Sequence, residues 1–350
     1  MKNKLQGCLI GAAIGDSLGL PYEALKPQTA KVLLGPPNKH KLLPGLGMVS
    51  DDTEHLVIVL RAFRKANGNL DLFSKQLASA LKLWTLALPL GVGKASLISG
   101  LKLLIGFSPE RSGIFSAGNG PAMRVSVLGL LCDNKEKLKE FVKRATLISH
   151  TDPKAYRSAL AVAHAANLAK EFTRVEPALF LKRFRELNDS YCKEFDLLLE
   201  KTIKSVELKQ STQDFAMNLG LIKGVSGYCY HTVPVCLHAW LSNQDNFSKG
   251  VTDAIKCGGD ADTVASIVGS LIGINVGREG IPDNWRRGLF DYPLNETSLV
   301  KIANDNLSRS VVKELIIFPF RQSVLFILII SHLILRMMGT PIILIRKKLK

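Results

Sequence analysis

The sequence predicts a mostly α-helical protein, because its apolar residues recur at helical intervals and strand-like alternation is scarce. Leu56, Leu60 and Phe63 follow the helical period, and so do the apolar residues of 138–145 and 264–271. Glycine and proline gather between such segments, as in LGPPNKHKLLPGLG and GREGIPDN, where they are typical of loops.

Composition narrows the classes of protein to which the chain can belong. With 350 residues, 47% of them hydrophobic, it can bury a large core. Its six cysteines form no Cys-x-x-Cys pair, which argues against a thiolate zinc site or a disulfide framework and favours a reducing, cytoplasmic compartment. The net charge of +16 suits an acidic partner such as nucleic acid, anionic lipid or a phosphate-bearing substrate. Nucleic acid is not expected, because the basic residues are dispersed and no aromatic-interleaved motif accompanies them.

The two ends of the chain differ in character. The opening MKNKLQGCLIGAAIGDSLGL is similar to a signal peptide, but Asp16 interrupts its apolar run, so we expect it to belong to the mature protein. Near the other end, the polar stretch NETSLVKIANDNLSRS follows Tyr292. The expected organisation is therefore a main domain of residues 1–305, a linker of 306–322 and a hydrophobic tail of 323–350 with a basic end.

The tail leaves two interpretations open. Its run Val324–Leu335 has twelve residues, whereas a membrane-spanning helix needs about 20. Extending it to Ile345 includes Arg336, and a central arginine costs roughly 2.5–3.5 kcal/mol on insertion. The tail is then either an extra helix packed on the domain or a membrane segment, spanning or interfacial, with its basic end at an anionic leaflet. The membrane segment is the favoured expectation.

Two distant segments carry acidic clusters at the start of apolar helices. SDDTEHLVIVLRAF begins with Ser50, Asp51 and Asp52, and GGDADTVASIVGSLIG contains Asp260, Asp262 and Thr263. Helix capping explains one such side chain at each site but not several. Carboxylates that meet in one pocket repel each other unless cations neutralise them, and oxygen ligands suit magnesium or manganese. Two clusters give room for two ions.

Other chemistries of acidic motifs fit less well. Asp-x-Asp also marks phosphohydrolases with an aspartate nucleophile, but these need the motif directly after a buried strand, and here KCGG precedes it. An EF-hand calcium loop is excluded, because no ligands follow from Val264 onward.

Three further segments contain polar residues with a candidate role. The N-terminal segment has a glycine at every fourth position, an interval that lets helix backbones approach closely: Gly7, Gly11, Gly15 and Gly19. Close packing does not explain the carboxylates of Asp16 and Glu23. Glu23 is a candidate acid/base group. Gly118, Asn119 and Gly120 open a predicted helix and could cradle phosphate on backbone N–H groups, although turns use glycine routinely. His150 precedes a predicted helix start near Pro153, and a lone histidine is more often structural.

In this order, GAAIGDSLGLPYE, SDDTE, GNGPAMR, SHTDP and GGDADTVASIVGSLIG resemble the ADP-ribosylglycohydrolase family, and GIPDNW also fits. The resemblance covers about Leu5 to Trp285. It implies a compact, orthogonal multi-helix all-α domain with two Mg²⁺ or Mn²⁺ ions, to which this chain adds the hydrophobic tail helix. It also implies hydrolysis of the glycosidic bond that joins ADP-ribose to an acceptor, with an ADP-ribosylated protein or other ADP-ribose conjugate as the partner.

The resemblance also implies roles by position. The metal ligands are expected at Ser50, Asp51, Asp52, Asp260, Asp262 and Thr263, and the catalytic residues at Glu23, Asp51, Asp52 and Asp260. Substrate is expected at Ser116, Gly118, Asn119, Gly120 and His150, with the diphosphate on the Gly118–Asn119 backbone. At Ala117 some relatives carry an aromatic residue that covers the substrate. The alternative functions are an inactive module that binds ADP-ribose or an ADP-ribosylated protein, and a membrane scaffold.

Overall fold

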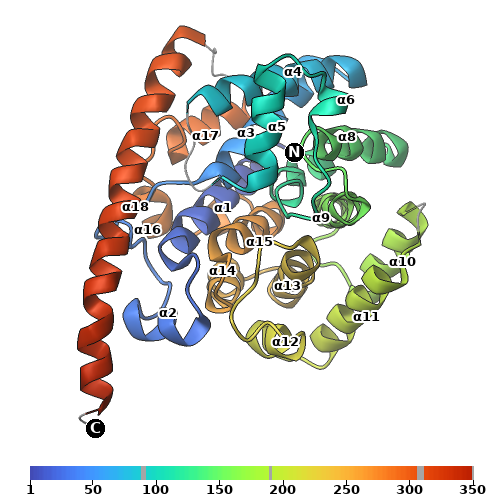
Figure 1. The fold of residues 1–350 in the computed structure, drawn as a ribbon. Helices are drawn as coiled ribbons and strands as arrows, with labels where there is room; N and C mark the ends of the chain where they lie inside the picture. The colour runs from blue at the N-terminus through green and yellow to red at the C-terminus, as the bar shows by residue number, and fades with distance from the viewer. Residues whose placement is uncertain (88–91, 189–190, 306–310, 349–350) are drawn as a thin grey trace.

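The computed structural model describes residues 1–87, 92–188, 191–305 and 311–348. These residues form helices and connecting loops, and backbone pairing between extended segments among them is limited to isolated bridges. The predicted all-α class is confirmed. Figure 1 shows α1 and α15 near the centre of the bundle and the long helix α18 along one side.

The helices have the following bounds. The α-helices are α1 (Lys2–Gly19), α2 (Pro27–Leu33), α3 (Asp51–Ala66), α4 (Leu70–Leu86), α5 (Lys94–Leu104), α6 (Pro109–Ser112), α7 (Ser126–Leu131), α8 (Lys135–Leu147), α9 (Pro153–Glu171), α10 (Pro177–Leu187), α11 (Lys193–Glu207), α12 (Thr212–Asn218), α13 (Cys229–Ser242), α14 (Phe247–Lys256), α15 (Ala261–Val276), α16 (Asp283–Gly288), α17 (Glu296–Ala303) and α18 (Val311–Lys348). Short 3-10 helices are η1 (Leu20–Tyr22), η2 (Ala122–Arg124) and η3 (Arg278–Gly280).

The packing of α1 against α15 explains the glycine spacing of the N-terminal segment. A Cβ atom added to Gly11 would lie 2.1 Å from the carbonyl oxygen of Gly269, and one added to Gly15 would lie 2.0 Å from that of Ala265. Both obstacles are backbone, which cannot rotate away as a side chain can. The close helix approach predicted from the glycine interval is therefore present, and it brings the end of α1, with Asp16, to the start of α15.

The hydrophobic tail forms a single helix with the residues before it. The expected linker of 306–322 is only partly described: 306–310 lie outside the described residues, and 311–322 form the first turns of α18. The expected boundary at 322–323 falls inside this helix. Within α18, Ile317–Ile334 is long and apolar enough to cross a membrane by length and composition.

One face of α18 is docked on the domain. Leu325 is buried with Leu20, Leu42 and Met48 in a small apolar cluster. Four residues earlier, the buried Arg321 forms ion pairs with two acidic residues of the domain. Of the two interpretations of the tail, the packed helix is thus the arrangement that the structure contains.

Candidate metal centre and substrate cavity

Three carboxylates from three different helices converge at the centre of the bundle. Asp16 comes from the end of α1, Asp52 from the first turn of α3 and Asp262 from the first turn of α15. All three are buried, and one oxygen of each lies within 4.8 Å of the corresponding oxygens of the other two. The acidic clusters that the sequence places far apart thus meet, with Asp16 as an additional member.

Asp16 joins α1 to the start of α3. Its Oδ1 accepts a hydrogen bond from the backbone N–H of Ser50 at 2.9 Å, and its Oδ2 accepts the hydroxyl of Thr53 at 2.6 Å and the Thr53 N–H at 3.2 Å. A carboxylate at the N-terminus of a helix satisfies free N–H groups and is favoured by the helix dipole. Asp16 therefore acts as a cap for α3 that is supplied by another helix.

The glycine pair before Asp260 brings Glu23 to the same site. Gly258 and Gly259 have φ values of +68° and +75°, and a Cβ at Gly259 would lie 1.9 Å from the carbonyl oxygen of Val225. The N–H of Gly259 donates to the carbonyl oxygen of Leu25 at 2.8 Å, and the N–H of Asp260 donates to that of Val225 at 2.7 Å. Because these backbones pair directly, the turn that carries Glu23 is held beside Asp260.

A cavity of about 510 Å³ opens over these carboxylates. This volume falls within the roughly 300–1,000 Å³ of small-molecule sites. Of the sequence-predicted site residues, its lining includes Glu23, Asp51, Asp260, Asp262, Thr263, Ser116, Gly118, Asn119, Gly120 and His150. Ser50 and Asp52 are buried and are outside this lining, but Asp52 belongs to the carboxylate cluster and the Ser50 hydroxyl donates to it. The structure thus brings all the predicted site residues to one region.

Two carboxylate oxygens of the cluster are buried and unpaired. Asp52 Oδ2 accepts the hydroxyls of Thr263 at 3.1 Å and Ser50 at 3.2 Å. Asp52 Oδ1 and Asp262 Oδ1 have no hydrogen-bond partner among the described residues. A buried carboxylate oxygen without a donor is unfavourable, whereas a hard divalent cation would satisfy it. The donor set, made entirely of oxygen, therefore fits Mg²⁺ or Mn²⁺.

The titration of the cluster reflects its crowding. Burial, followed by repulsion from neighbouring carboxylates, raises the pKa values of Asp51, Asp52 and Asp262 well above the usual range. Burial raises the pKa of Asp16 to about 6, against the opposing effect of its hydrogen bonds. Burial and then the charge of Asp260 raise the pKa of Glu23 to about 7. Without a cation, the cluster can reduce its repulsion only by taking up protons.

Helix capping accounts for part of the two motifs. The Ser50 hydroxyl accepts the backbone N–H of Asp52 at 3.3 Å and so caps α3. At α15, by contrast, the side chain of Asp260 makes no capping bond to the described backbone. Asp260 Oδ2 instead accepts the amide of Asn119 at 2.6 Å. Capping therefore explains Ser50, whereas Asp260 and Asp262 are oriented toward the cavity.

The loop of Gly118, Asn119 and Gly120 is expected to offer free backbone N–H groups to a phosphate, but two of these N–H groups have partners within the protein. The N–H of Asn119 donates to the carbonyl oxygen of Gly227 at 2.9 Å, and the N–H of Gly118 donates to the Ser116 hydroxyl at 3.3 Å. The loop leads into the short η2, not directly into an α-helix. These two N–H groups would have to change partners to bind a diphosphate. The side chain of Asn119 instead orients Asp260.

His150 lies against the same loop. A Cβ added to Gly118 would be 2.9 Å from His150 Nε2, and one added to Gly120 would be 3.1 Å from its Cε1, so the glycines give the ring its space. His150 Nδ1 lies 2.8 Å from the hydroxyl of Ser149. Burial and the charge of Arg124 lower the pKa of His150 to about 3. The ring is therefore neutral at physiological pH.

Comparison with known proteins now identifies the family. A model of ADP-ribosylglycohydrolase matches residues 1–314. The chain belongs to the ADP-ribosylglycohydrolase family. ADP-ribosylhydrolase ARH3 of Gallus gallus is 25% identical over 335 residues and covers 81% of this chain and 88% of its own length. ADP-ribosyl-[dinitrogen reductase] glycohydrolase of Rhodospirillum rubrum is 26% identical over 293 residues, with 80% and 87% covered.

Other similarities agree with this family. An uncharacterized protein of Archaeoglobus fulgidus is 28% identical over 311 residues, covering 86% of this chain and 96% of its own. A solved structure of an ADP-ribosylglycohydrolase-related protein complex superposes with a TM-score of 0.66 at 22% identity, covering 87% of this chain and 99% of that chain. This last likeness shows the shared fold.

The family model ends at residue 314, so nearly all of α18 lies outside it, and α18 still contributes contacts at the site. Arg336 donates to the carbonyl oxygens of Pro21 and Glu23, with Nη2 at 3.2 Å from the latter. Its charge lowers the pKa of Glu23 and so opposes the effect of burial. Sequence reasoning gave Arg336 no role at the site, because no motif links residues this far apart. It also left Asp16 without an assigned role.

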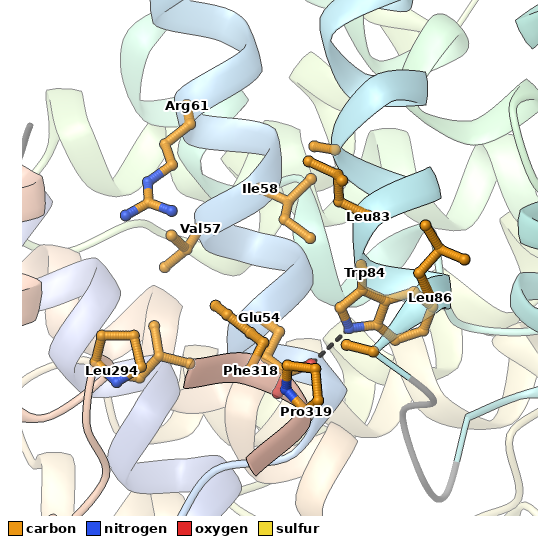
Figure 2. A pocket seen from close by; sticks show the side chains of 13 residues that line it. Glu54, Val57, Ile58, Arg61, Leu83, Trp84, Leu86, Leu294, Phe318 and Pro319 are labelled. Atoms are coloured by element: carbon orange, nitrogen blue, oxygen red, sulfur yellow. Dashed lines mark hydrogen bonds between the residues drawn. The ribbon is translucent and has the colours of Figure 1, made fainter. Parts of the chain in front are cut away.

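A second cavity, of about 120 Å³, is lined in part by Glu54 (Figure 2). It is bounded by α3, α4 and, from α18, Phe318 and Pro319. Figure 2 shows the Trp84 indole directed at Glu54, and Trp84 Nε1 donates to Glu54 Oε2 at 2.5 Å. The other oxygen of Glu54 accepts hydrogen bonds from the side chains of Arg321 and Gln322, so both carboxylate oxygens have partners. This cavity is therefore a gap in the packing of α18 on the domain.

Proposed function

We propose that this protein hydrolyses the glycosidic bond between ADP-ribose and an acceptor, such as an ADP-ribosylated protein. Family membership and the activities in the names of its relatives support this reaction. The observation that carries the proposal is the pair of unpartnered buried oxygens, Asp52 Oδ1 and Asp262 Oδ1, beneath a cavity of ligand size. A cation site with an adjoining cavity is the arrangement that metal-assisted hydrolysis requires.

The proposed metal ligands extend the sequence-based set by one residue. Asp16, Asp52 and Asp262 would hold a divalent cation, because their oxygens are mutually close. The expectation of two Mg²⁺ or Mn²⁺ ions involves Asp51 and Asp260 at the cavity edge, together with the hydroxyls of the remaining predicted ligands, Ser50 and Thr263. When bound, such ions supply Lewis acidity and lower the pKa of water.

The protein's own side chains would provide the remaining chemistry. With its pKa raised to about 7, Glu23 can accept or donate a proton at its carboxylate near neutral pH, as an acid/base group must. Positive charge develops on the ribose as the acceptor leaves, and fixed carboxylates beside the ring stabilise it. Asp260, whose carboxylate accepts a hydrogen bond from the Asn119 amide, would take this role. Ser116, Gly120 and His150 would line the ADP-ribose side of the cavity.

Mass spectrometry of defined substrates tests the proposal. Peptides carrying arginine-, serine- or O-linked ADP-ribose are incubated with the full chain and Mg²⁺ or Mn²⁺, and release of ADP-ribose is expected from at least one linkage. Asp260→Asn should abolish release, whereas Asp283→Asn, at a half-exposed carboxylate outside the site, should not. Unchanged peptides in every case would refute hydrolysis, and full activity of Asp260→Asn would refute the proposed role of Asp260 in it. Tight ADP-ribose binding without turnover, measured by calorimetry, would instead identify a binding module.

A further inference from the structure

The two faces of α18 differ sharply in their surroundings. Residues at helical spacing contact the domain: Arg321, Gln322 and Leu325 are buried, and Arg336 donates to two backbone carbonyls near Glu23. The opposite face consists mainly of large apolar side chains that are exposed: Phe320 (72%), Phe326 (44%), Ile327 (62%), Ile330 (38%), Leu333 (40%) and Ile334 (51%). A surface helix of a soluble domain normally presents polar residues there. This outward face, which we call the apolar stripe, is therefore unusual.

The charges of α18 and of the two residues after it are equally one-sided. Between residues 311 and 350, Glu314 is the sole acidic residue of the sequence, whereas Arg346, Lys347, Lys348 and Lys350 cluster at the end. Figure 1 shows the C-terminal part of α18 projecting past α2, away from the body of the domain. An apolar stripe continued by a basic cluster is typical of helices that lie in the interface of an anionic membrane.

The docked face argues against a spanning orientation. Arg321 pairs with Asp291 at 2.5 Å and with Glu54, and the side chains of all three are at most 3% exposed. Insertion of Ile317–Ile334 across a bilayer would pull Arg321 from both partners and leave two buried carboxylates without their cation. An orientation in the plane of the membrane keeps these ion pairs and still covers the apolar stripe.

We propose that α18 attaches the protein to the surface of an anionic membrane, lying in the bilayer interface while it stays docked on the domain. The apolar stripe would enter the headgroup–acyl boundary, and the basic end would contact anionic lipid. This proposal does not depend on the hydrolase activity, because it involves the opposite face of α18.

Vesicle sedimentation tests the proposal with the full chain, diluted from mild detergent. Binding to phosphatidylcholine vesicles that contain phosphatidylserine is expected, and binding to phosphatidylcholine alone should be weaker. The double variant Ile327→Ser/Ile330→Ser should lower partitioning by more than about tenfold. Replacing Arg346, Lys347 and Lys348 by Gln should lower it on the order of a hundredfold. The matched control Met217→Ser/Ile222→Ser, at exposed apolar positions elsewhere, should bind as the natural protein does.

Three outcomes would overturn the proposal. Equal recovery of the natural protein and the stripe variant with the vesicles would show that the apolar stripe is not the contact. Retention in the membrane after alkaline carbonate would identify a spanning helix. Absence of vesicle binding, together with a dimer in sedimentation velocity that the stripe variant abolishes, would identify a second copy of the chain as the partner. Release by carbonate and by high salt supports the interfacial orientation.

Discussion

Arg321 Nε donates to Asp291 Oδ1 at 2.6 Å in the interface between α18 and the domain, where both side chains are buried. Removing one partner of a buried ion pair leaves an uncompensated charge and costs about 3–5 kcal/mol. Arg321→Ala should therefore lower the free energy of unfolding by this amount, as measured by urea denaturation. Arg287→Ala, which breaks an exposed ion pair with Asp283, should change it by less than about 1 kcal/mol. Equal effects of the two substitutions would show that α18 is not docked through Arg321.

The packing of α1 on α15 leaves no room for a methyl group. Gly11→Ala would place Cβ 2.1 Å from the carbonyl oxygen of Gly269, so the two helices must move apart. We expect a loss of about 1–3 kcal/mol of stability from this overpacking, read from the midpoint of urea unfolding. Gly93→Ala is the control, since its Cβ would meet no atom of the described chain within 4 Å. A neutral Gly11→Ala would contradict the close helix contact.

Stability should depend on pH through the carboxylate cluster. Burial raises the pKa of Asp16 from 3.8 to about 6, and burial with Asp260 raises that of Glu23 from 4.5 to about 7. Between the unfolded-state and folded-state pKa values of each group, the folded state binds more protons than the unfolded state. The free energy of unfolding of the metal-free protein should therefore fall as pH rises from about 4 to 7. Urea unfolding in EDTA measures this slope.

Divalent cations should reverse that loss. Binding to the folded state alone stabilises by about 2.7 kcal/mol when the ion is present at 100 times its Kd. We therefore expect Mn²⁺ or Mg²⁺ to raise the melting temperature most at neutral pH, where the carboxylates repel each other, and least at acidic pH. A melting temperature that is equal with EDTA and with Mn²⁺ at every pH would contradict a cation site.

Arg336 should act as a positioning residue for Glu23 if the hydrolase proposal holds. It donates to the backbone of the Glu23 turn, and its charge lowers the pKa of Glu23. Arg336→Gln should therefore raise the pKa of Glu23. With Glu23 acting as the general base, the acidic limb of the kcat/KM profile should then move to higher pH. Arg287→Gln should leave the profile in place. An unshifted limb in Arg336→Gln would show that α18 does not influence the site.

Much of the centre of the molecule could be predicted from the sequence. The glycine interval of α1 predicts close packing, and that packing carries Asp16 to α15. Each of the two acidic motifs has more carboxylates than helix capping needs. That excess predicts a carboxylate cluster, which Asp52 and Asp262 form. Both predictions work because they depend on local patterns of small or charged residues.

The remaining features depend on contacts between distant residues. Arg321 pairs with Glu54 at a separation of 267 residues, and no periodicity in the tail marks it as an internal ion-pair partner. Likewise, the Asn119 N–H donates to the carbonyl oxygen of Gly227, so a loop that suited phosphate by composition has its donor engaged. Such tertiary partners become visible only when the helices are assembled.

Anomalous scattering from crystals soaked in Mn²⁺ tests the central claim most directly. The account predicts a peak within coordination distance of Asp16, Asp52 and Asp262, and its loss in Asp262→Asn crystals soaked in the same way. A map without a peak among these carboxylates, in crystals of the natural protein, would contradict the assignment of a divalent metal centre.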